Sequence, residues 1–186
     1  MRNLIARVFD YSLDGFVADE GTDYFQFCRD LSDDAGQLDR TGELYESAYA
    51  HIMGRGVYEG MASYFPTAVD HPYADTLNAA RKVVFSRTLE KADWENTTIA
   101  AGDTAEEIDK LRRGAGGDII VSGGVSFWRS LMCLDLIDEF RVTLFPYLAS
   151  QGTRLFDDAG TSRQLDLVSS TAWSNGTIEL EYRRHR

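Results

Sequence analysis

Three short stretches of the chain carry residue types that bind phosphate. Gly123 and Gly124 are adjacent glycines that separate an apolar run from a helical pattern. Arg55 stands between two glycines, and Arg87 stands between a serine and a threonine. Glycine at the start of a helix lets backbone N–H groups approach a phosphate, and guanidinium and hydroxyl groups donate further hydrogen bonds to it. Together the three stretches favour a ligand that bears several phosphates, such as a dinucleotide.

Each stretch also has an ordinary explanation. The glycine pair could serve only a tight turn that needs positive φ, and each arginine could form a surface ion pair. The run Ser12–Ala18, which follows the first expected strand, contains no G-x-G-x-x-G, so the Rossmann fingerprint is missing. The dinucleotide hypothesis therefore requires that all three stretches meet in one cleft.

Composition and charge narrow the class of protein. The 186 residues are 44% hydrophobic, which predicts a single domain over residues 1–186. The formal net charge of -11 argues against nucleic-acid and anionic-membrane partners, because phosphate surfaces would repel the chain. Cys28 and Cys133 are isolated, so neither a metal site nor a disulfide framework is expected. The amino-terminal run lacks the pattern of a signal peptide or membrane span, and we expect a cytoplasmic protein.

Strands and helices are expected to alternate along the chain. Apolar and β-branched runs predict strands at Leu4–Tyr11, Tyr49–Met53, Lys82–Ser86, Thr97–Ala100, Asp118–Ser122, Glu139–Tyr147, Leu165–Ser169 and Thr177–Arg183. Helices are expected at Asp23–Leu31, Gly42–Ser47, Val57–Tyr64, Tyr73–Ala79, Thr104–Arg113 and Val125–Leu134. Thr104 followed by Glu107 matches a capping box, and Gly114 stands where that helix should end.

This alternation predicts an α/β fold around a mixed sheet. Strands separated by helices pair mostly in parallel, whereas the last two strands should form an antiparallel hairpin through Trp173–Gly176. Ligands of such sheets bind at the carboxyl ends of the strands. Because the three phosphate-suited stretches all follow predicted strands, we expect the ligand at that edge.

Five motifs in order give the chain a resemblance to the dihydrofolate-reductase-like superfamily. Within it, the chain most resembles the family of the C-terminal reductase domain of the bifunctional riboflavin-biosynthesis deaminase-reductase. The motifs are Ser12–Gly15, Met53–Glu59, Lys82–Arg87, Val121–Gly124 and Ile137–Arg141, followed by Pro146 and Leu155–Phe156. The resemblance implies a three-layer fold with a central sheet of about eight strands, mostly parallel, and an NADPH-dependent reductase.

The resemblance also implies a set of cofactor-binding residues. Gly54, Arg55, Gly56 and Val57 would hold the pyrophosphate and the adenosine side. Ser86, Arg87 and Thr88 would meet the adenosine ribose and its 2′-phosphate. Gly123, Gly124, Val125, Ser126 and Phe127 would wrap the pyrophosphate and nicotinamide ribose, with Val17 and Ala18 beside the nicotinamide. Arginine and hydroxyl groups suit a third phosphate, so NADP is favoured over NAD.

Two carboxylates are candidates for proton supply to the substrate. Asp14 lies in the Ser12–Gly15 motif, and Asp23 begins a D-x-x-x-F spacing similar to that of the pterin-binding acid of dihydrofolate reductases. The alternative for Asp14 is a turn aspartate that hydrogen-bonds its own backbone. The alternative for Asp23 is a helix N-cap.

Aromatic residues are the candidates for substrate contact. Phe16 stands where the resembled family usually has a lysine, which puts the riboflavin step itself in doubt. Phe16, Phe27 and Tyr58 are expected to bind a flat ring, together with Phe25, Tyr64 and Phe65, although core packing is the commoner fate of such aromatics.

Two functions from different classes follow. The first is an NADPH-dependent reductase of a small pteridine-like or pyrimidine-like heterocycle, in or related to riboflavin or folate metabolism. The second is an NADP(H)-binding module without turnover that acts as a sensor or scaffold. Family resemblance, together with the long strand expected at Glu139–Tyr147, also predicts a homodimer.

Overall fold

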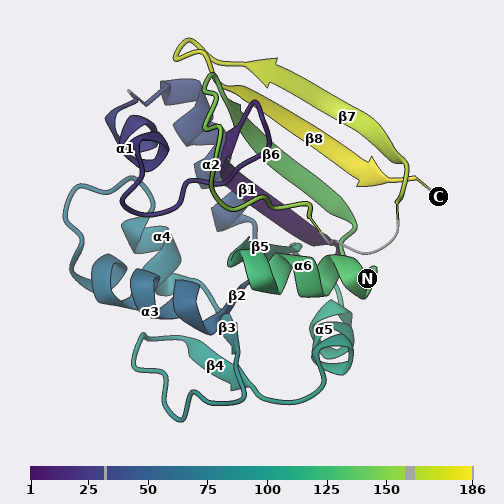
Figure 1. Ribbon diagram of the computed structural model, residues 1–186. Coiled ribbons are helices and arrows are strands. Elements are labelled where there is room, and N and C mark those ends of the chain that lie inside the picture. Colours follow the sequence, from purple (N-terminus) through teal and green to yellow (C-terminus); the bar gives the residue numbers. More distant parts are fainter. Residues whose placement is uncertain (32, 158–161, 186) are drawn as a thin grey trace.

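An eight-stranded sheet runs through the molecule in the order β4-β3-β2-β5-β1-β6-β8-β7 (Figure 1). The computed structural model describes residues 1–31, 33–157 and 162–185. The strands are β1 (Leu4–Ser12), β2 (Ala50–Gly54), β3 (Lys82–Phe85), β4 (Thr97–Ala100), β5 (Ile119–Gly123), β6 (Glu139–Phe145), β7 (Leu165–Ala172) and β8 (Ile178–Arg184). The helices are α1 (Asp23–Asp30), α2 (Ala35–Glu46), α3 (Arg55–Tyr64), α4 (Ala74–Ala79), α5 (Thr104–Arg112) and α6 (Val125–Cys133), with a 3-10 turn at Phe65–Thr67.

The strand pairing confirms the predicted mixed sheet. All pairs from β4 across to β6 are parallel, and β8 is antiparallel to both β6 and β7. The β7–β8 hairpin turns at Trp173–Gly176 as expected, with Trp173 and Thr177 joined by a backbone hydrogen bond of 2.9 Å. The carboxyl ends of the parallel strands therefore lie at one edge of the sheet.

Helices cover both faces of the sheet and give the three layers. On one face, residues such as Leu4 and Val121 pack against α5 and α6. On the other face, Ile5 and Ile120 pack against α2, α3 and α4. The alternation of neighbouring strand residues between two cores explains the continuous apolar runs in the sequence. Full burial of one such aliphatic side chain stabilises the fold by about 1.5–3 kcal/mol.

Several boundaries differ from the sequence predictions for local reasons. The helix expected at residues 42–47 begins at Ala35, because the Asp34 carboxylate caps it by accepting the N–H of Gln37 at 3.1 Å. The predicted capping box is wrong: Asp103 is the N-cap of α5, and it accepts the N–H groups of Ala105 and Glu106. That helix ends before Gly114 as expected, where φ is +102°.

Two further features concern the strands β6 and β1. β6 lies between β1 and β8 inside the sheet, so both of its edges are paired within the chain. β1 is irregular near its carboxyl end: its register with β6 shifts between Val8 and Tyr11, and Asp10 has a φ of 53°. A β-bulge of this kind changes the direction in which a side chain points.

In the described residues, no helix has the length and apolar character needed to cross a bilayer.

Candidate functional site

The three phosphate-suited stretches follow three adjacent strands. β3, β2 and β5 are neighbours in the sheet, with Gly54 paired to Phe85 and Met53 paired to Gly123. The residues that follow these strand ends are therefore brought to one edge. The structure thus places the ends of these three strands side by side, which is the arrangement that a dinucleotide site would need.

The glycines allow two helix starts to approach each other closely. A Cβ atom on Gly54 would lie 3.4 Å from the Cβ of Phe127, and one on Gly123 would lie 3.4 Å from a methyl group of Val57. Gly123 and Gly124 also have φ values of +144° and +98°, which residues with a side chain rarely adopt. Space and backbone conformation both explain why the chain has glycine at the end of β5.

Both helix starts leave backbone donors available. Gly54 caps α3 and Gly124 caps α6, and neither supplies a side chain to the first N–H groups of its helix. The first turn of a helix has unpaired N–H groups and a partial positive charge. Two such turns next to each other fit the pyrophosphate of a dinucleotide.

Arg55 joins the ends of β2 and β3. Its guanidinium donates to the hydroxyl of Thr88 at 3.0 Å and pairs with Glu59 at 2.7 Å. Arg55 thus also forms the exposed ion pair that was its ordinary explanation. Its link to Thr88 holds one cation and one hydroxyl together beside the start of α3.

A hollow of about 310 Å³ opens beside the end of β3. Its lining residues are Phe85, Ser86, Arg87, Ala100, Gly102, Asp103, Thr104 and Phe127. The rings of Phe85 and Phe127 lie 4.9 Å apart and form its apolar part. Arg87 is exposed and forms no ion pair with any described residue. A flat apolar surface next to an unpaired guanidinium fits the adenosine end of a phosphorylated nucleotide.

The loop after β1 is held by the segment around residue 153. Val17 pairs with Tyr11 and donates its N–H to Thr153 at 2.9 Å. Phe16 is buried, and the guanidinium carbon of Arg154 lies 4.2 Å from the centre of its ring. A cation is therefore present at Phe16, although no lysine occupies that position. The structure leaves Val17 and Ala18 half-buried near the end of β1.

Asp14 ties the first loop to a second one. Its carboxylate accepts the N–H of Ala149 at 3.0 Å, the N–H of Ser150 at 2.7 Å and the hydroxyl of Ser12 at 2.7 Å. Desolvation would raise the pKa of Asp14, but these hydrogen bonds outweigh it and lower the pKa to about 2. A carboxyl group with this pKa is ionised at neutral pH and fits a structural role better than proton donation.

Asp23 is the exposed first residue of α1. The predicted alternative, an N-cap, is wrong for Asp23, because Thr22 is the cap and accepts the N–H of Phe25 at 3.2 Å. Asp23 lines a hollow of about 310 Å³ with Gly21, Thr22, Tyr24, Tyr147, Ala149 and Gln151. Its carboxylate is thus accessible next to an aromatic wall.

The predicted aromatic residues do not form one slot. Phe27 on α1 packs against Tyr147, with ring centres 4.8 Å apart. Tyr58 on α3 is only 4% exposed, belongs to the core, and accepts the N–H of Trp94 at 3.2 Å. Tyr58 therefore has the packing role that was the commoner expectation, while Phe27 lies near the hollow beside α1.

Asp10 is a candidate that sequence reasoning missed. It is half-buried near the carboxyl end of β1, and desolvation raises its pKa, although the charge of Arg7 opposes the rise. Tyr24 and Cys28 of α1 interact electrostatically with it. The signal available in the sequence was a carboxylate at the end of an otherwise apolar first strand.

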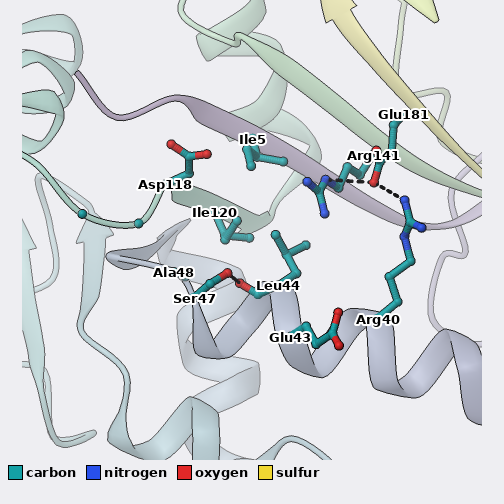
Figure 2. Close-up of a pocket in the computed structure, with 12 residues that line it drawn as sticks. Ile5, Arg40, Glu43, Leu44, Ser47, Ala48, Asp118, Ile120, Arg141 and Glu181 are labelled. Carbon is teal, nitrogen blue, oxygen red and sulfur yellow. Dashed lines mark hydrogen bonds and ion pairs between the residues drawn. The ribbon is translucent and has the colours of Figure 1, made fainter. Parts of the chain in front are cut away.

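Another cavity lies away from these residues (Figure 2). Its volume is about 530 Å³, and its lining includes Ile5 and Ile120, which stand at the amino ends of β1 and β5. Three of its charged side chains form ion pairs: Glu181 lies 2.6 Å from Arg40 and 3.5 Å from Arg141. The position and the paired charges give it no part in the candidate cofactor site.

Comparisons with known proteins agree with this architecture. The family described as the RibD C-terminal domain matches residues 4–178. YyaP of Bacillus subtilis (strain 168), an uncharacterized protein, is 29% identical over 176 residues, which cover 92% of this chain and 89% of YyaP. A Shewanella sp. PV-4 protein with a provisional riboflavin-biosynthesis assignment has a TM-score of 0.78, is 23% identical, and is covered completely, as is this chain. Dihydrofolate reductase from Enterococcus faecalis, solved with NADP(H), has a TM-score of 0.63 at 14% identity, with 99% of this chain and 97% of that one covered.

Proposed function

The chain belongs to the RibD C-terminal domain family, and from this membership and its strand-end geometry we propose that it is an NADPH-dependent reductase. Its substrate would be a small pteridine-like or pyrimidine-like heterocycle, in or related to riboflavin or folate metabolism. The fold is that of dihydrofolate reductase, and the Enterococcus faecalis enzyme of that fold was solved with NADP(H). Bound NADPH would supply the hydride.

The observation that carries the proposal is the meeting of three strand ends. The start of α3 and the glycine pair are in contact, and Arg55 reaches Thr88 at the end of β3. We assign the pyrophosphate to the N–H groups that follow Gly54 and Gly124. These residues come from three parts of the chain, and their proximity is difficult to explain by turn geometry alone.

Selectivity for NADPH is assigned to the residues after β3. Ser86, Arg87 and Thr88 would bind the 2′-phosphate, because hydroxyl and guanidinium groups form charge-assisted hydrogen bonds with it. Arg87 is exposed and has no ion pair among the described residues. Its guanidinium is therefore available to a ligand without the loss of an existing pair.

The heterocycle is assigned to the region between β1 and α1. Val17 and Ala18 would lie beside the nicotinamide, with Phe16 and Phe27 as candidates for contact with the substrate ring. Phe16 lies under the Arg154 guanidinium, and Phe27 lies against Tyr147. Among the carboxylates, Asp23 is accessible, whereas Asp14 already holds Ala149 and Ser150.

Calorimetry with NADPH and NADH tests cofactor binding. We expect tighter uptake of NADPH, and a loss of about 10-fold to 150-fold in NADPH affinity in Arg87→Ala, since a charged hydrogen bond contributes about 1.5–3 kcal/mol. NADH affinity should change much less. Arg113→Ala, which removes an exposed arginine at the far end of α5, is the matched control and should bind NADPH normally. Equal affinity of the wild type for the two nucleotides would contradict the assignment of the 2′-phosphate.

A substrate panel separates the reductase from a second candidate function. An NADP(H)-binding module without turnover would bind the cofactor equally well, and the structural tie of Asp14 agrees with such a module. We expect dihydrofolate, dihydropterins or the riboflavin-pathway pyrimidine to cause loss of NADPH absorbance at 340 nm with the wild type. Binding without oxidation across the panel would favour the module.

Assembly and location complete the proposal. We propose a homodimer, as the family resemblance implies, and sedimentation velocity would measure its mass. We place it in the cytoplasm, because a sequence without a disulfide framework suits a reducing compartment. A monomer at micromolar concentration would contradict the proposed assembly.

A further inference from the structure

Three protic side chains converge where the end of β1 meets α1. They are the carboxyl group of Asp10, the hydroxyl of Tyr24 and the thiol of Cys28, which interact electrostatically with one another. Asp10 has a φ of 53° at the bulge in β1. A positive φ on a residue with a side chain costs about 1–3 kcal/mol, and such strain persists mainly where a side chain must be aimed.

The groups of the cluster have few hydrogen-bond partners. Within the described ranges, no group donates a hydrogen bond to the Asp10 carboxyl. Arg7, the cation on the same strand, is engaged by Glu179 at 3.1 Å and Thr143 at 2.8 Å. The Tyr24 side chain is 3% exposed, and among the described residues its hydroxyl has a single partner, the Cys28 thiol. A thiol is a weak hydrogen-bond partner, so a buried hydroxyl that has no other partner can still bind a polar group of a ligand.

The surroundings raise the pKa of all three groups. Desolvation raises the pKa of Asp10, and the charge of Arg7 opposes the rise. Desolvation also raises the pKa of Tyr24, and it raises that of Cys28 to about 12. On α2, desolvation raises the pKa of Tyr45 to about 12. The carboxyl group therefore holds its proton at a higher pH than an ordinary aspartic acid does.

The cluster adjoins the part of the site assigned to the nicotinamide. Val17 pairs with Tyr11, which directly follows Asp10 in the sequence. β1 is also the neighbour of β5, which ends in the glycine pair. A ring held beside Val17 would therefore lie next to the strand that carries Asp10.

We propose that Asp10 is the acid that delivers a proton to a ring nitrogen of the substrate, with the Tyr24 hydroxyl as the group that positions the ring. The inference rests on the proposed reductase function. The carboxyl O–H bond breaks as the N–H bond forms, and the adjacent ring carbon gains a hydride from the reduced nicotinamide. The C=N bond becomes CH–NH, the carboxylate regains a proton from water, and the reductant is oxidised. Asp14, by contrast, is held ionised by its hydrogen bonds, and Asp23 is exposed to water.

The first test observes the proton on Asp10 without any ligand. Protein labelled with ¹³C at the aspartate carboxyl carbons is titrated by NMR, and Asp10→Asn identifies the Asp10 signal. We expect Asp10 to titrate above the ordinary aspartate value of about 3.9. Titration of Asp10 at or below that value would overturn the inference.

The second test measures turnover of the NADPH-loaded protein. Asp10→Asn keeps the shape of the side chain and tolerates positive φ, so we expect normal NADPH affinity with a drop in kcat of about 10²-fold to 10⁴-fold. In the wild type, kcat/KM should fall as pH rises through the pKa of Asp10, and this fall should vanish in the variant. Asp109→Asn, an exposed charge on α5, is the matched control and should leave kcat unchanged.

The outcomes distinguish this inference from the proposed function. Wild-type turnover by Asp10→Asn would overturn the role of Asp10 and leave the reductase intact. A wild-type protein that binds no NADPH would overturn both. Tyr24→Phe adds a further measurement: it should raise KM and leave the Asp10 titration above its ordinary range.

Discussion

Substitution of Gly124 by alanine tests whether the glycine pair serves the ligand as well as the turn. Gly124 has φ +98° and ψ 103°, a conformation that alanine adopts at a cost of about 1–3 kcal/mol. The new Cβ would lie 3.6 Å from both the Cβ of Phe127 and a methyl group of Val57, which is ordinary contact. The loss of stability should therefore come from the backbone. For a chain of this size it corresponds to a fall in Tm of about 2–12 °C.

Gly54 separates the effect on stability from the effect on binding. Its φ is −79°, so alanine can replace it without backbone strain, although its Cβ would approach the Cβ of Phe127 to 3.4 Å. We expect Gly54→Ala to change Tm little and to weaken NADPH binding, because the methyl group would displace Phe127 in the first turn of α6, whose N–H groups are assigned to the pyrophosphate. Gly60→Ala, in α3 with no atom within 4 Å of the new Cβ, should raise stability by about 0.5–1 kcal/mol and bind normally.

Thermal melts with and without NADPH give both quantities from one assay. A saturating ligand at 100 times its Kd should raise the stability of the wild type by about 2.7 kcal/mol, and this shift should shrink in Gly54→Ala and Gly124→Ala. Full NADPH stabilisation of both variants would refute the reasoning, because it would show that the glycines serve only the turn.

Three further predictions concern charged groups. Glu179→Gln leaves the guanidinium of Arg7 buried without its partner, so urea unfolding should show a loss of about 3–5 kcal/mol. Burial lowers the pKa of Lys82 to about 8, so the unfolded state binds its proton more tightly than the folded state does. The stability of the wild type relative to Lys82→Met should therefore increase from pH 8 to pH 10.5. The pKa of Asp14 is lowered to about 2, so its contribution to stability should be complete above about pH 4 and disappear as pH falls towards 2. In Asp14→Asn, amide hydrogen exchange at Ser150 should become faster.

The strands could be predicted because burial within the sheet requires apolar runs that are visible in the sequence. β4 has the expected bounds, and the bounds of β1, β2, β3 and β5 differ by one or two residues. β1, β2, β3 and β5 are mostly buried on both faces, which requires a nearly continuous apolar run in the sequence. Strand order cannot be predicted in the same way, because it depends on which helix crosses to which neighbour.

Helix starts were less predictable, because capping depends on contacts with distant residues. Asp34 caps α2 and also accepts the N–H and hydroxyl of Ser174, in the turn of the β7–β8 hairpin. The sequence near residue 34 contains no pattern that predicts a contact with Ser174, which is 140 residues away. Gly36 and Gly42 also lower the helix propensity of this segment, so its sequence predicts too short a helix.

Some residues of the candidate site could be predicted from the sequence, and others could not. The glycines and arginines at strand ends could be predicted, since residue type and position after a strand are both local features. Asp10 could not be predicted, because its role depends on the β1–β6 register shift and on α1 covering it.

Arginine at a strand end is informative only when the fold leaves it without a partner. Most arginines near the sheet are used in a ladder across β1, β6 and β8: Arg7 binds Glu179, Arg141 binds Glu139 and Glu181, and Arg183 binds Glu139. Arg55 is shared between Glu59 and Thr88. Arg87 differs, because it is exposed at the edge of a hollow and has no ion pair within the described residues. In a chain with a net charge of -11, a cation that is left unpaired beside an apolar hollow has the electrostatic character that an anionic ligand needs.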